Sequence, residues 1–138
     1  ELRIYLKENN SPYRNCILIA RAYDDGVAFR LNFTGYSEID SLILIKEKTV
    51  FRLLPGTAYA LRLKHFRTPY ENNYEIMRTG KIPSDRPIAL PFLVHLDDGP
   101  WMAITEADLY DYPGMYLYPV ELLHPPSDWA FRVCITRI

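Results

Sequence analysis

Apolar and polar side chains alternate along several short segments of the chain. In residues 2–7 and 27–33 every second side chain is apolar, which is the period of a strand with one buried face. For residues 74–77 the pattern fits a short strand and a single helical turn equally well. The chain begins and ends on strand-like residues, and further strands are expected at residues 13–23, 41–45, 49–53, 58–63, 88–96 and 101–104.

Turn residues separate these segments. Asp24-Asp25-Gly26 and Asp97-Asp98-Gly99 each join two apolar runs, and an Asp-Gly pair in this position is a strong hairpin signal. No segment sustains an amphipathic helical stripe, and the eleven prolines and six glycines also disfavour a helical bundle. The pattern predicts an all-β fold, an antiparallel β-sandwich, in a single domain spanning residues 1–138.

Composition narrows the classes of partner. The 138 residues are 49% hydrophobic and 14% aromatic, which is typical of a soluble globular protein and not of a disordered one. Sixteen Lys and Arg against seventeen Asp and Glu give a net charge of -1, so nucleic acid is not an expected partner. No apolar run approaches the roughly 18 residues of a membrane helix, so no membrane partner is expected either.

Cysteine and histidine residues form no recognisable site. Cys16 and Cys134 lie far apart in strand-like runs, which favours buried free thiols over a disulfide, a zinc knuckle or a redox motif. His65, His95 and His124 are scattered without the spacing of metal ligands. The sequence also contains no Ser-His-Asp order, phosphate-binding loop or dinucleotide-binding glycine motif.

Four short strings are more specific than the alternation. They are YDDGVAFR at residues 23–30, KTVF at 48–51, PYENNY at 69–74 and ITEADLYDYPGMYL at 104–117. Together they resemble the N-terminal domain of glycoside hydrolase family 97, a group of calcium-dependent bacterial α-glucosidases and α-galactosidases. The resemblance covers nearly the whole chain, although residues 129–133 match the family pattern only with inserted residues.

The resemblance implies a truncated part of a larger enzyme. Family members combine an N-terminal β-supersandwich of the galactose-mutarotase-like type, a catalytic (β/α)8 barrel and a small C-terminal β-domain. This chain would be the later part of the first domain, without its opening strands and without the barrel. The resemblance further implies the barrel of the same parent chain as partner, α-linked oligosaccharides as substrate, calcium as cofactor, and a periplasmic or secreted location.

Glu106 is the candidate metal ligand. In the family that the chain resembles, one glutamate of the N-terminal domain reaches the active site in the barrel and helps to hold calcium. The resemblance assigns this role to Glu106, in the motif Thr105-Glu106-Ala107. A carboxylate suits calcium, which prefers hard oxygen ligands. The alternative is a solvated carboxylate at the end of a strand.

The aspartates and tyrosines that follow Glu106 in the sequence each have two interpretations. Asp108 and Asp111 could form a pair for acid–base chemistry, but their position beside a Tyr-Pro-Gly turn favours bonds to backbone N–H groups. Four tyrosines could stack on a sugar ring, but packing is favoured for most of them. These are Tyr110, Tyr112, Tyr116 and Tyr118. No catalytic residue is assigned.

The predicted function is a non-catalytic domain that packs on the catalytic barrel and contributes a calcium ligand and part of the pocket wall. One alternative is a stand-alone carbohydrate-binding module with a shallow aromatic face. Another is a mutarotase-like enzyme, which needs histidines and carboxylates gathered around a sugar, whereas the histidines here are scattered. The absence of the opening strands leaves unpaired β-edges, and these predict self-association.

Overall fold

The structure is a computed structural model that describes residues 1–11, 13–34, 44–109, 112–120 and 129–135. Within these ranges the only helical element is the 3-10 turn η1 (Thr79–Lys81), and no helix has the length and apolarity needed to cross a membrane. All strand pairings are antiparallel, which confirms the predicted all-β antiparallel fold class. The chain divides into two compact units, Glu1–Ile43 and Leu44–Ile138, and the assignment of one domain to residues 1–138 stays a prediction.

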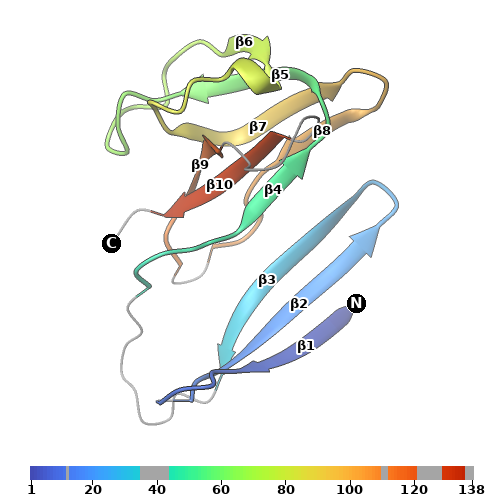
Figure 1. Cartoon of the computed structure of the whole chain (residues 1–138), viewed down its shortest axis with the longest axis vertical. Helices are drawn as coiled ribbons and strands as arrows, with labels where there is room; N and C mark the ends of the chain where they lie inside the picture. The colour runs from blue at the N-terminus through green and yellow to red at the C-terminus, as the bar shows by residue number, and fades with distance from the viewer. Residues whose placement is uncertain (12, 35–43, 110–111, 121–128, 136–138) are drawn as a thin grey trace. The chain divides into compact units, whose positions relative to one another are not determined.

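The first unit contains a three-stranded sheet in the order β1-β2-β3 (Figure 1). Its strands are β1 (Leu2–Lys7), β2 (Asn15–Tyr23) and β3 (Gly26–Thr34). Asp24 and Asp25 form the turn between β2 and β3, and Tyr23 pairs with Gly26. The first predicted hairpin is therefore confirmed.

One face of this sheet is wholly apolar. Ile4 of β1 lies opposite Leu18 of β2, which lies opposite Leu31 of β3, and every second residue repeats this pattern. Because side chains alternate between faces along a strand, the apolar residues of all three strands share one face. They are Leu2, Ile4, Leu6, Cys16, Leu18, Ala20, Ala22, Val27, Phe29, Leu31 and Phe33. Many of these side chains are exposed to solvent.

The second unit contains a seven-stranded sheet in the order β4-β10-β9-β7-β5-β6, with β8 also paired to β7 (Figure 1). Its strands are β4 (Val50–Leu53), β5 (Gly56–Arg62), β6 (Glu75–Arg78), β7 (Ile88–Leu96), β8 (Trp101–Ile104), β9 (Met115–Val120) and β10 (Trp129–Ile135). Asp97 and Asp98 form the turn between β7 and β8, as predicted. The central strand β7 pairs with β5, β8 and β9.

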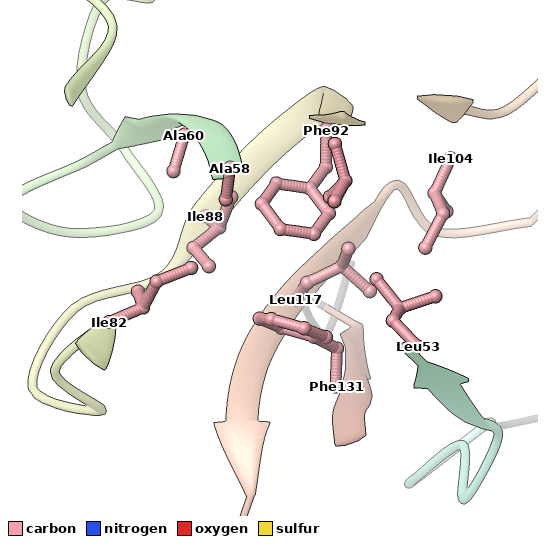
Figure 2. Close-up of a cluster of buried hydrophobic side chains, with 10 residues drawn as sticks. Leu53, Ala58, Ala60, Ile82, Ile88, Phe92, Ile104, Leu117 and Phe131 are labelled. Atoms are coloured by element: carbon pink, nitrogen blue, oxygen red, sulfur yellow. The ribbon is translucent and has the colours of Figure 1, made fainter. Parts of the chain in front are cut away.

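The core of the second unit lies inside a strongly curved sheet. Leu53 of β4 and Ile104 of β8 belong to one buried cluster, although three other strands separate β4 from β8 in the pairing order (Figure 2). In a flat sheet this separation would be roughly 19 Å, since neighbouring strands lie about 4.8 Å apart. The sheet therefore folds over its own apolar face. Phe92 of β7 and Phe131 of β10 meet at its centre, with ring centroids 4.8 Å apart.

The strand predictions differ from the structure in two places. Residues 41–43 of the expected strand 41–45 lie outside the described residues, and Leu44 and Ile45 have no regular structure. Strand β9 was not expected, although it lies between β7 and β10. Residues 74–77, which the pattern left open, belong mostly to the strand β6.

Candidate functional site

Glu106 lies just beyond the end of β8 and is held by the beginning of β9. The backbone N–H of Met115, the first residue of β9, donates a hydrogen bond of 2.7 Å to Glu106 Oε1. Strands β8 and β9 both pair with the central strand β7, so this bond closes the connection between them. The half-buried carboxylate is therefore a positioned group and not a fully solvated one.

The electrostatic surroundings of Glu106 disfavour its ionised form. Burial raises the pKa of the Glu106 carboxyl, the bond from Met115 lowers it, and the charge of Glu47 raises it. Glu47 is itself held by the Tyr112 hydroxyl, which donates a hydrogen bond of 2.8 Å to Glu47 Oε2. Two anchored carboxylates thus repel each other here, and a cation would relieve that repulsion.

An aromatic cluster accompanies the two carboxylates. The Tyr70 hydroxyl donates a hydrogen bond of 2.7 Å to the Tyr116 hydroxyl, and Tyr116 packs edge-on against Phe66 with ring centroids 5.0 Å apart. Burial, the bond to Tyr116 and the charge of Glu106 all raise the pKa of Tyr70. The charge of Glu106 therefore reaches Tyr70, a member of the aromatic cluster.

The predicted tyrosines are divided among several environments. Tyr116 is buried, which fits the packing role favoured for most of these rings, whereas Tyr112 and Tyr118 are half-buried. Tyr118 also meets Phe66 edge-on, with centroids 6.4 Å apart. Tyr110 lies outside the described residues.

The remaining candidate residues are exposed, make other contacts, or are not among the described residues. Asp108 is exposed to solvent, and Asp111 is not among the described residues. His65 is exposed, and His95 stacks on Trp101 with centroids 4.6 Å apart. Cys16 is a free thiol, but it is half-buried and not buried as expected. His124 and the side chain of Cys134 fall outside the part that the structure describes.

The described residues form no metal site by themselves. None of them form a group of three or more His, Cys, Asp and Glu residues that could hold a metal ion. The sequence analysis located Glu106 but missed Glu47, Tyr70 and Phe66. No spacing rule could have found these three, because they are brought to Glu106 only by the folding of the sheet.

Comparison with known proteins agrees with the family resemblance that the four strings indicated. The family model described as Glycosyl-hydrolase 97 N-terminal matches residues 1–127. The chain belongs to this family. It is 31% identical over 109 residues to a retaining α-galactosidase of Bacteroides thetaiotaomicron, and the match covers 73% of this chain and 16% of that relative. This family domain thus spans about a sixth of the length of the relative, and no solved structure matches it.

Proposed function

We propose that this domain is the non-catalytic N-terminal part of a calcium-dependent α-glucosidase or α-galactosidase. The family match over residues 1–127, together with a relative named as a retaining α-galactosidase, supports the proposal. In the proposed enzyme, a (β/α)8 barrel of the same chain carries the chemistry and takes α-linked oligosaccharides as substrate. The enzyme is periplasmic or secreted.

The proposed role of Glu106 is to supply one calcium ligand and part of the pocket wall. Its carboxylate is positioned by Met115 N–H, and the nearby charge of Glu47 makes a cation favourable at this point. Calcium takes six to eight oxygen ligands, of which two carboxylates supply at most four. The residues therefore fit a half-site for calcium, which a second set of oxygens on the barrel would complete. Bound calcium would orient the substrate and stabilise developing negative charge.

Calcium titration of the full-length enzyme tests this role. Glu106→Gln keeps the shape of the side chain and an acceptor for Met115 N–H but removes the charge, so it should weaken calcium binding and activity together. Glu71→Gln, at an exposed position, is the matched control and should change neither. The readouts are calcium affinity by calorimetry and activity against calcium concentration. Equal calcium affinity in wild type and Glu106→Gln would refute the role of Glu106.

The isolated chain should not hydrolyse nitrophenyl α-glucosides or α-galactosides. The proposal places the reacting carboxylates on the barrel, and Glu106 here is engaged with Met115. Release of nitrophenol by the purified 138-residue chain should equal the rate in buffer. Turnover that persists through purification and is lost in Glu106→Gln would contradict a non-catalytic role.

The proposal also includes self-association of the isolated chain through strand edges. Among the described residues, β1 and β3 each pair on one side only. Such edges present unpaired N–H and C=O groups to any extended strand. The exposed apolar face of the same sheet adds a hydrophobic driving force.

A further inference from the structure

A polar hollow of about 300 Å³ lies in the second unit, where β5 and β6 meet the segment that precedes β7. The residues that line it are all polar or charged, and none is aromatic or aliphatic. They are Arg62, Lys64, Asn72, Asn73, Glu75 and Arg86. None of them belongs to the Glu106 site.

Three of the lining residues, Arg62, Glu75 and Arg86, form a closed ring of four charges with Asp85. Arg62 donates to Glu75 Oε2 over 3.1 Å and to the Asp85 carboxylate, although its own side chain is only 3% exposed. Arg86 completes the ring, because its Nη2 lies 3.4 Å from Glu75 Oε1 and its Nε lies 3.5 Å from Asp85 Oδ2. Arg62 also donates to the Pro83 carbonyl over 3.2 Å. Each charge in the ring therefore has two opposite neighbours, which offsets the cost of burying Arg62.

This ring holds hydrogen-bonding groups in place before any ligand arrives. The Glu75 carboxylate is clamped through both oxygens, yet its side chain remains 36% exposed and faces the hollow. Asn72 and Asn73 add amide donors and acceptors from the loop that leads into β6. Groups fixed in this way lose little conformational entropy on binding.

The chemistry of the lining selects a class of ligand. An apolar ligand finds no apolar wall, and a small anion would have to lie beside the Glu75 carboxylate. The two carboxylates of the ring neutralise its two guanidinium groups, and Lys64 adds one further positive charge to the lining. A ligand with many hydroxyl groups fits this mixed lining, because each hydroxyl can accept from Lys64 or Arg86 and donate to Glu75.

We propose that this hollow binds one monosaccharide unit, through hydrogen bonds from its hydroxyl groups to Glu75, Asn72 and Arg86. The volume supports a single ring, since it lies at the lower end of the range for small-molecule sites, about 300 to 1,000 Å³. The assignment does not depend on calcium or on Glu106. It adds a sugar contact at a separate place in the second unit.

The test is a titration of the 15N-labelled 138-residue chain, in EDTA, with methyl α-D-glucopyranoside and methyl α-D-galactopyranoside. At least one glycoside should produce saturable shifts of the side-chain signals of Asn72, Asn73 and Arg86. The Asn72→Ala/Asn73→Ala double variant should bind more weakly, by roughly fivefold for each lost hydrogen bond. Asn9→Ala, at an exposed position in the first unit, is the matched control and should bind like wild type.

Several outcomes would overturn the assignment. These are no saturable shift with either glycoside, unchanged affinity in the double variant, or saturable shifts with sodium phosphate in place of the glycosides. Glu75→Gln should also abolish binding. Because this substitution breaks the charge ring, its binding result is interpreted only if a dispersed NMR spectrum shows that the variant is folded. Because EDTA removes calcium, the result is independent of the calcium role proposed for Glu106.

Discussion

Glu106 illustrates how a single carboxylate can be positioned and destabilised by the same fold. The hydrogen bond from Met115 N–H places one oxygen, while partial burial and the charge of Glu47 oppose ionisation. A folded-state pKa above the unfolded value means that folding favours the protonated form. The stability that this group contributes is therefore greatest below about pH 4.3, the usual pKa of Glu, and declines as pH rises toward the folded pKa.

Glu106→Gln and Glu106→Ala should differ in stability at neutral pH without calcium. Gln removes the unfavourable charge and keeps an acceptor for Met115 N–H, so the free energy of unfolding should rise at pH 7 but not at pH 3.5. Ala removes the same charge but leaves that N–H without its acceptor, so its free energy of unfolding should be about 1 kcal/mol below that of the Gln variant. Urea unfolding at the two pH values measures both, with Glu71→Gln as the exposed control. A Gln variant that is less stable at pH 7 would contradict this account of Glu106.

At this scale the sequence predicted one partner of the site and missed the others. The string from Ile104 to Leu117 contains both Glu106 and Met115, so the two residues joined by this hydrogen bond lie in one of the four strings. Glu47 is distant in the sequence and has no motif that links it to Glu106. Its influence arises only from folding, which no local pattern encodes.

At the scale of elements, the close pairing of β5 with β7 depends on the absence of a side chain at Gly56. A Cβ added there would lie 2.4 Å from the carbonyl oxygen of His95, a backbone atom that cannot move independently of β7. Gly56 N–H also donates a 3.2 Å hydrogen bond to Thr79 Oγ1, which ties β5 to η1. The start of β5 is therefore a tightly packed junction.

Gly56→Ala should destabilise the chain, by about 1 to 3 kcal/mol, because the clash forces the two strands apart. Gly26→Ala is the matched control, since a Cβ at the β2–β3 hairpin would have no neighbour within 4 Å. The control should remain within about 0.5 kcal/mol of wild type. Urea unfolding of the three proteins gives the comparison. Equal stability of the two variants would mean that β5 and β7 are not packed this closely.

Hydrophobic patterning predicted most of the strands, including the well-buried β5 and β7, and it failed for β9. Residues 115–120 read Met-Tyr-Leu-Tyr-Pro-Val, with no charged residue and a proline, so no period of two is visible. The structure explains this composition, because β9 lies between β10 and β7 and buries Tyr116 and Leu117, which point to opposite faces. A strand covered on both faces shows no alternation, and β9 also lacks the Asp-Gly turn that marks the end of β7.

At the scale of the whole chain, sequence strings identified the family while the arrangement of charges remained hidden. The four strings are local, so they can be read without a structure. The ring of Arg62, Glu75, Asp85 and Arg86 draws on β5, β6 and the segment before β7, and therefore depends on strand pairing. The apolar face of β1–β3 could be predicted only in part. Alternation predicts the apolar residues of each strand, but the pairing register decides that they all share one face.

Self-association of the isolated chain should depend on that apolar face. Val27 is 83% exposed on it, and its neighbour Ala28 is exposed on the opposite face of the edge strand β3. Pairing of two chains along β3 would join their apolar faces, so a charge at Val27 would be brought into an apolar contact. Val27→Lys should therefore weaken the concentration-dependent association seen by sedimentation velocity, whereas Ala28→Lys should not. A monomeric wild-type chain at high concentration, or an equal effect of the two lysines, would refute association through this sheet.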